Sequence, residues 1–167
     1  MTATKTTSRP PINATQFAAN VERITNEASF DEAIALFHDD AVTDWIIDGV
    51  REYHVGIDAI QRGFTVLTAL WRQHHLQVQK RLECASADTI VLTWRGGFRN
   101  DHSQFGTEIW TFRDNLVIHH QMYGYLNVRP RTSLTAAARL FTVSPRIALS
   151  AVSQQVRYGG MRSLIRP

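Results

Sequence analysis

The spacing of apolar residues divides the chain into a first half dominated by helices and a second half dominated by strands. Apolar positions recur at helical spacing in three stretches, residues 14–28, 29–41 and 57–73. Later stretches alternate apolar and polar residues as strands do, with short polar turns between them: residues 76–85, 89–99, 105–113 and 116–126. Residues 42–54 form a further candidate, a hairpin that turns at Asp48-Gly49, because this pair accepts the left-handed backbone of a two-residue turn.

The order of these stretches predicts the fold class. Because the helices are not interleaved with the strands, the pattern favours an α+β fold over a doubly wound sheet. Four consecutive strands joined by short turns predict a mostly antiparallel meander. Asn13 followed by Gln16 is typical of a helix start at the head of the first stretch. A chain of 167 residues is long enough for one globular domain with a sizeable core.

Composition marks off both ends of this domain. Residues 1–12 are rich in Thr, Ser and Pro, which bury little on folding, so we expect a mobile segment ahead of a domain at 13–126. Residues 127–167 carry seven Arg and no acid, whereas all 15 acidic residues precede them. Amphipathic stretches at 134–143 and 145–157 predict a helical extension. Their short, Ala-rich apolar stripes favour packing on protein over contact of the Arg residues with an anionic membrane surface.

Several classes of protein are disfavoured. No run of about 18 apolar residues is present and the first residues lack the apolar segment of a secretory signal, so we expect a cytoplasmic protein that spans no membrane. The single cysteine, Cys84, excludes an internal disulfide and a cysteine-rich zinc site. The histidines show no metal-ligand spacing with acids, and there is no glycine-rich phosphate loop, so we expect neither a metal nor a cofactor.

A carboxylate stands among aromatic residues in the stretch GTEIWTFR. Strand side chains alternate between faces, so Glu108 shares a face with Trp110 and Phe112. An isolated carboxylate in an apolar setting is costly, and burial of this face would require Glu108 to be paired, neutralised or used chemically. The alternatives are a solvated Glu at a sheet edge, or a Glu paired with Arg95 or Arg99.

The chain contains FDEAIALFHDDAVTDW, YHVGIDAIQRGF and GTEIWTFRDNLVIHHQMYGY in this order. Together these segments resemble the nuclear transport factor 2-like superfamily, in particular its SnoaL-like (polyketide cyclase) and ketosteroid isomerase-like branches. The resemblance implies a cone-shaped domain, in which a curved, mostly antiparallel sheet wraps around three helices and encloses an apolar cavity. Members often dimerise through the sheet. Because they include isomerases, cyclases, dehydratases and proteins without catalysis, the function has to be argued from the site.

The resemblance implies roles for two acids. Glu108 falls where ketosteroid isomerase-like members hold a protonated carboxylic acid that donates to a developing oxyanion, and a desolvated carboxyl stays partly protonated near neutrality. Either Asp44 or Asp48 falls close to the general base on the first strand, and the hairpin turn explains Asp48 better. The alternation of Asp44 with Val42 and Ile46 suits an inward position, and the alternative is a solvated acid at a strand end. Val21 stands where those members have an oxyanion-binding Tyr.

The resemblance also implies a histidine base and a set of ligand contacts. His75 matches the base of dehydratase-like members, although Asn26 replaces the Asp that orients it; the alternative is a polar helix end facing the helix dipole. Tyr123 matches a catalytic Asp of epoxide hydrolase-like members, and a neutral Tyr excludes that chemistry. Tyr123 and Gln121 are expected instead to orient a ligand within an aromatic wall: Trp45, Phe64, Trp94, Trp110 and Tyr125.

These observations favour a cofactor-free acid/base enzyme of the isomerase, cyclase or dehydratase type, acting on a hydrophobic, cyclic carbonyl compound. Glu108 would be the acid or oxyanion donor, His75 or Asp44 the base, and Tyr123 an orienting group. The alternative is a non-catalytic ligand-binding or protein-assembly module of the same fold. We expect a homodimer formed through the sheet and no nucleic-acid partner.

Overall fold

The computed structural model describes residues 12–100 and 102–126, together with residues 142, 144–146, 149, 150 and 153. The chain forms two compact units, Met1–Val128 and Arg129–Pro167. Nearly all of the segment expected to be mobile and most of the extension expected to be helical lie outside the described residues. Both expectations therefore stay predictions, although the described residues 145, 146, 149 and 150 are helical.

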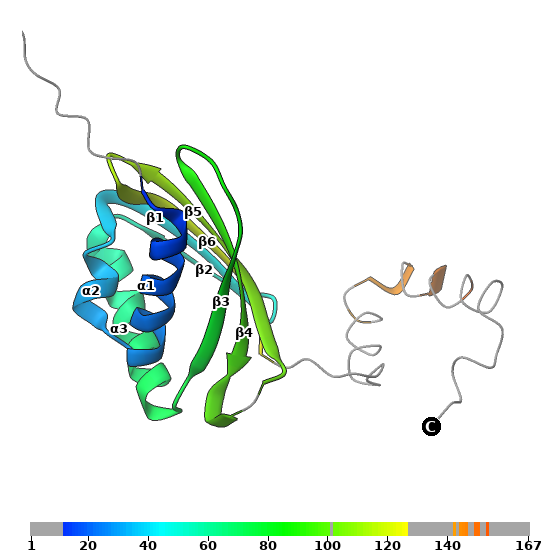
Figure 1. Cartoon of the computed structure of the whole chain (residues 1–167). Helices are drawn as coiled ribbons and strands as arrows, with labels where there is room; N and C mark the ends of the chain where they lie inside the picture. Colours follow the sequence, from blue (N-terminus) through cyan, green and yellow to red (C-terminus); the bar gives the residue numbers. More distant parts are fainter. Residues whose placement is uncertain are drawn as a thin grey trace, which may run out of the picture. The chain divides into compact units, whose positions relative to one another are not determined.

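Three helices lie together on one face of the sheet (Figure 1): α1 (Ala14–Glu27), α2 (Phe30–Ile34) and α3 (Ile57–Gln73). The side chain of Asn13 accepts a hydrogen bond from the backbone N–H of Gln16 at 3.1 Å, which confirms the predicted start of α1. α1 ends at Glu27, and the residue that caps it, Ala28, has a left-handed backbone with a φ of 50°. Among the described residues, no helix has the length and apolar character needed to cross a membrane.

Six strands form one curved sheet in the order β2-β1-β6-β5-β4-β3 (Figure 1). β1 pairs with β6 in parallel, and all other neighbouring strands are antiparallel. This arrangement confirms the predicted α+β class and the mostly antiparallel sheet. The strands have these bounds: β1 (Phe37–Ile47), β2 (Val50–Val55), β3 (Gln77–Ala85), β4 (Thr89–Gly97), β5 (Gln104–Arg113) and β6 (Leu116–Tyr125).

The β1–β2 hairpin turns where the sequence predicted, but β1 begins earlier. Asp48 and Gly49 are both left-handed, with φ angles of 50° and 80°. The helix expected to run to residue 41 ends at Ile34, and β1 already starts at Phe37. Pairing with the distant β6 decides this boundary, because the backbone N–H of Val117 donates to the Leu36 carbonyl at 2.8 Å and Phe37 lies opposite Val117.

One extra residue in β6 changes which of its side chains face the helices. Across the β5–β6 turn, Phe112 pairs with Val117, but the next residue of β5, Thr111, pairs with His119. Ile118 is therefore a bulge, and a one-residue slip moves every later side chain to the opposite face. As a result His120, Met122 and Gly124 are buried on the helix side.

Trp94 lies flat on the sheet over two glycines. Trp94 on β4 is opposite Gly106 on β5, and Gly106 is opposite Gly124 on β6. A Cβ atom on Gly106 would lie 2.6 Å from the indole and 2.5 Å from the Tyr123 carbonyl oxygen, whereas one on Gly124 would lie 3.3 Å from the indole. The absence of side chains at these two positions makes room for the ring.

We expect Gly106→Ala to lower the free energy of unfolding by about 2–3 kcal/mol, because both the carbonyl and the indole must move to relieve the overlap. Gly124→Ala, with the looser contact, should cost under about 1 kcal/mol. Urea unfolding followed by circular dichroism measures both. Equal costs for the two variants would contradict this account of the packing.

Candidate functional site

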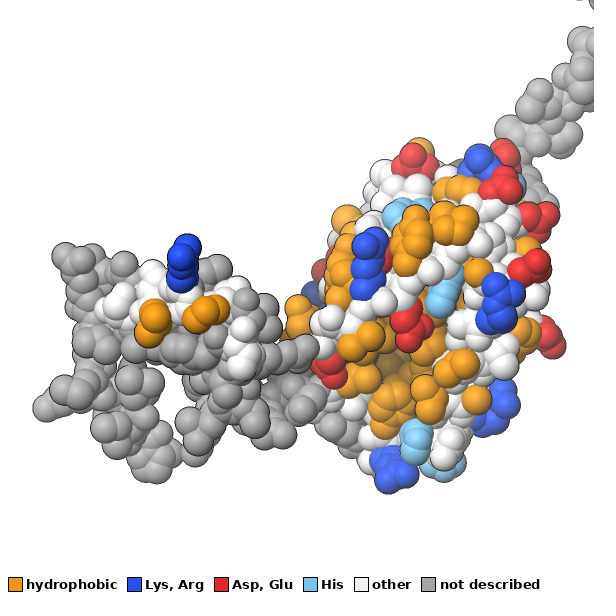
Figure 2. All heavy atoms as spheres, turned by 180° about the vertical axis from the view of Figure 1, so that it is seen from behind, with side chains coloured by type: hydrophobic (Ala, Val, Ile, Leu, Met, Phe, Trp, Pro, Cys, Tyr) orange, Lys and Arg blue, Asp and Glu red, His pale blue; other side chains and the backbone are white. Residues whose placement is uncertain are grey.

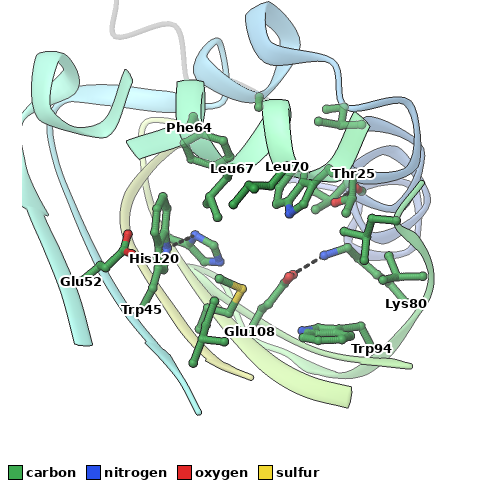
Figure 3. Close-up of a pocket in the computed structure, with 18 of the residues that line it drawn as sticks. Thr25, Trp45, Glu52, Phe64, Leu67, Leu70, Lys80, Trp94, Glu108 and His120 are labelled. Carbon is green, nitrogen blue, oxygen red and sulfur yellow. Dashed lines mark hydrogen bonds and ion pairs between the residues drawn. The ribbon is translucent and has the colours of Figure 1, made fainter. Parts of the chain in front are cut away.

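A cavity of about 480 Å³ lies between the helices and the inner face of the sheet. Its lining is largely apolar and includes all four tryptophans together with Phe64 and Met122 (Figure 3). The cavity opens to solvent beside three lining residues that are exposed, Val50, Glu52 and Leu70. Seen from behind, the surface of the domain is hollowed among hydrophobic side chains (Figure 2). Concave apolar sites of this size are typical of small-molecule binding.

A buried ion pair crosses this cavity. Lys80 on β3 and Glu108 on β5 point toward each other (Figure 3), with 2.5 Å between Lys80 Nζ and Glu108 Oε1. Only 3% of the Lys80 side chain and 5% of the Glu108 side chain are exposed. The second carboxylate oxygen, Oε2, accepts a hydrogen bond from Trp110 Nε1 at 3.1 Å. The prediction that Glu108 lies on the aromatic face is correct, but its charged partner is Lys80, not Arg95 or Arg99.

His120 is a further buried titratable group that lines the cavity. Its ring stacks on Trp110 at a centroid distance of 3.7 Å, and its Nδ1 accepts a hydrogen bond from Trp45 Nε1 at 3.1 Å. Burial, and secondarily the positive charge of Lys80, hold the pKa of His120 well below its ordinary value of 6.5. The ring is therefore neutral at physiological pH.

Asp44 and His75 lie outside the cavity. Thr43 and Trp45 are buried on the inner face of β1, so Asp44 between them faces outward. It accepts two 2.8 Å hydrogen bonds from Arg51, which hold the pKa of Asp44 below its ordinary value. His75 is exposed, and its neighbour His74 lines the cavity instead.

Asn26, in the place of the orienting Asp, has a structural role. Its side chain donates to the Val78 carbonyl at 2.9 Å and accepts from the Val78 N–H at 2.8 Å. The backbone N–H of Lys80, two residues after Val78 in β3, donates to Glu22 Oε2 at 2.6 Å. Side chains of α1 thus bind the backbone of β3.

Three further candidates lie on the outer face of the sheet. Gln121, Tyr123 and Tyr125 follow the bulge at Ile118, so they point away from the helices. Tyr123 and Tyr125 are 36% and 52% exposed. Of the aromatic contacts that the sequence suggested, those that line the cavity are Trp45, Phe64, Trp94 and Trp110.

Sequence reasoning missed Lys80 and His120. The sequence did contain a signal for Lys80. Val78, Lys80 and Leu82 are spaced two residues apart, so Lys80 lies on the same face of the strand as two apolar residues. For His120 the signal was weaker, because its face depends on the bulge. No group of three or more His, Cys, Asp or Glu that could hold a metal ion occurs among the residues that the structure describes.

Solved structures with the same arrangement are numerous, although no family model and no curated protein matches the sequence. A SnoaL-like protein of unknown function from Burkholderia thailandensis aligns with a TM-score of 0.53 and 15% identity, over 69% of this chain and 98% of its own. An NTF2-like protein of unknown function from Mesorhizobium loti has a TM-score of 0.51 and 13% identity, over 70% and 96%. The domain has the nuclear transport factor 2-like fold.

A provisionally named isomerase from Bacillus subtilis has the same fold, with a TM-score of 0.51 and 16% identity over 68% of this chain and 89% of its own. Identities this low establish the fold alone. The predicted resemblance to nuclear transport factor 2-like and SnoaL-like proteins is confirmed at that level. The fold accommodates binding proteins and enzymes, so the chemistry of the cavity has to carry the functional argument.

The buried neutral His120 predicts a pH dependence of stability. Below about pH 6.5 the unfolded chain binds a proton at His120 that the folded chain does not, so stability falls as pH decreases. As the pH falls from about 6.5 to 5, the extra loss of stability in wild type relative to His120→Gln should steepen toward about 1.4 kcal/mol per pH unit. His102→Gln, at an exposed position, is the control and should follow wild type. Parallel urea-unfolding curves for wild type and His120→Gln across this range would contradict the assignment.

Proposed function

We propose that the protein is a cofactor-free acid/base enzyme of the isomerase, cyclase or dehydratase type that acts on a hydrophobic, cyclic carbonyl compound inside the cavity. The observation that carries the proposal is the ion pair between Lys80 and Glu108, which is buried in a largely apolar site. Solved structures of the same fold include a provisionally named isomerase and SnoaL-like proteins, which supports a cavity-based chemistry without specifying it.

A buried ion pair contributes little to stability compared with apolar packing of the same volume. Desolvating both charges costs several kcal/mol per ion, and apolar residues of similar volume often serve stability as well or better. Lys80 and Glu108 are nevertheless placed where a ligand would touch them, among aromatic side chains. This placement favours a chemical role over a purely structural one.

Glu108 is the group that we assign to proton transfer. The ammonium of Lys80 stabilises the charged carboxylate, and the hydrogen bond from Trp110 orients it. A carboxylate held in this way accepts a proton from the carbon next to a bound carbonyl group and returns it elsewhere, which gives isomerisation, ring closure or elimination according to the substrate. Lys80 has three N–H donors, so it can hold Glu108 and still contribute to stabilising the enolate.

The first test uses deuterium exchange, which reports proton abstraction without the natural substrate. A ketone with exchangeable protons, 1-tetralone, is incubated with the protein in deuterated buffer, and NMR follows exchange at the carbon next to the carbonyl. Wild type should accelerate exchange, and Glu108→Gln should reduce the acceleration by at least about 10²-fold because the amide cannot act as the base.

Asp44→Asn is the matched control, since it removes a carboxylate that faces away from the cavity, and it should keep the wild-type rate. Exchange that is equally fast in Glu108→Gln would exclude the role of this residue. No acceleration by wild type would favour the second candidate, a non-catalytic binding protein.

That second candidate is supported by the state of the carboxylate, because both oxygens of Glu108 already have partners. In a binding protein the pair would fix the polar end of a bound ligand. Saturable binding of polycyclic ketones or phenols, seen as a rise in melting temperature without exchange, is the result that this candidate predicts.

We also propose that a second copy of the chain packs on the outer face of the sheet. This face carries exposed aromatic residues on three strands, with exposures of 56% for Tyr53, 40% for Phe105 and 52% for Tyr125. Exposed apolar patches of this kind often mark contact surfaces.

Wild type should elute as a dimer in size-exclusion chromatography with light scattering, and the double variant Tyr53→Lys/Tyr125→Lys should elute as a monomer, because four charges would then meet at the interface. Val66→Lys, which changes an apolar residue of α3 that is 60% exposed, is the control and should stay dimeric. A wild-type monomer would exclude the proposed dimer.

A further inference from the structure

We infer that the Nε2–H group of His120 binds the acceptor oxygen of the ligand, so that the ligand is an apolar molecule with a carbonyl or equivalent oxygen in the middle of the cavity. This inference deepens the proposed function and rests on its claim that the cavity takes a carbonyl compound. It does not require turnover.

The tautomer of His120 is set by its neighbour. An indole N–H can only donate, so the 3.1 Å contact from Trp45 Nε1 requires an unprotonated Nδ1 on His120. A neutral imidazole then carries its single proton on Nε2. Stacking on Trp110 at an interplanar angle of 14° fixes the plane of the ring. The direction of the Nε2–H bond is therefore fixed by two tryptophans.

This N–H group is buried and has no partner among the described residues. Buried donors without a partner are rare in proteins, and each calls for an explanation. Figure 3 shows the second ring nitrogen of His120 turned toward the space between this ring and Glu108. A ligand oxygen in that space would satisfy the donor and would lie near the carboxylate that we assign to proton transfer.

Several other polar groups that line the cavity already have partners. Glu108 accepts from Lys80 and Trp110, and the hydroxyl group of Thr25 donates to the Val21 carbonyl at 2.8 Å. The unpartnered indole N–H of Trp94 packs against the backbone of the sheet, since a Cβ on Gly106 would lie 2.6 Å from it. Among the described lining residues, His120 thus offers a ligand a neutral buried donor, in addition to the further N–H groups of the charged Lys80.

The charges around His120 favour the same kind of ligand. Lys80 on β3 and, to a smaller extent, His119 on β6 lower the pKa of His120 by their charge, and Glu108 on β5 is paired with Lys80. The neighbours from β1 are apolar or aromatic, Phe37 and Trp45. A neutral donor beside an ammonium group suits an oxygen that carries or develops negative charge, and it offers no acceptor to a cation.

The test compares fluorenone with fluorene, two flat tricyclic molecules that differ in one carbonyl oxygen. Isothermal titration calorimetry should show that wild type binds fluorenone about tenfold more tightly than fluorene, the worth of one buried hydrogen bond. His120→Phe keeps a ring but loses the donor, and it should bind both compounds alike. His120→Gln keeps an N–H donor and should restore part of the preference.

A second measurement on wild type covers the case that His120→Phe fails to fold. Long-range proton–nitrogen NMR should show the proton of His120 on Nε2, with a shift of that signal on adding fluorenone and none on adding fluorene. Equal affinity of wild type for the two compounds, binding of neither, or a proton on Nδ1 would each overturn the inference. If the fluorenone preference holds while the exchange reaction is absent, the enzyme proposal fails and this inference stands.

Discussion

β6 lies between β1 and β5 in the sheet, and the extra residue Ile118 fixes which of its side chains face the helices. With the bulge, His120 and Met122 reach the cavity and the tyrosines of the same strand face outward. Without it, the strand would place Gln121 and Tyr123 inside and lose the imidazole that Trp45 and Trp110 hold. The chemistry of the cavity and the aromatic outer face therefore both depend on this one-residue shift in the register of β6.

The positive charge of Lys80 acts on two groups at once. It pairs with Glu108, which makes a buried carboxylate tolerable, and it disfavours a second positive charge on His120. The buried part of the cavity thus brings together the cation Lys80, the anion Glu108 and the neutral donor His120. Removing any one of them changes the electrostatics of the remaining two, so the three side chains form a coupled unit.

The fold could be predicted from sequence because its signals are local. The helix cap at Asn13, the hairpin at Asp48-Gly49 and the alternation around Glu108 each follow from a few neighbouring residues. The end of α2 could not be predicted, because pairing of Phe37 with Val117, far along the chain, turns the residues after it into a strand. Long-range pairing overrides local preference in such places.

The site was harder to predict than the fold, because the face on which a strand residue lies also depends on pairing with distant strands. Strand alternation placed Glu108 correctly, since no irregularity interrupts β5 near it. The same rule placed Asp44 in the cavity and the family resemblance placed Tyr123 there, but neither residue lines it. For Tyr123 the cause is the bulge at Ile118, which no turn residue in the sequence indicates. For Asp44 the apolar neighbours Val42 and Ile46 proved to belong to the outer face, which is itself partly apolar.

The contacts between α1 and β3 have a consequence for the edge of the sheet. β3 is an outermost strand, and a strand there presents backbone groups that can pair with another chain and start aggregation. Asn26 occupies both backbone groups of Val78, and Glu22 occupies the N–H of Lys80, as a further strand would. Side chains of a helix thus close this edge, and they do so along the part of β3 that supplies the cavity with its lysine. Protection against self-association and support of the site are carried by the same three hydrogen bonds.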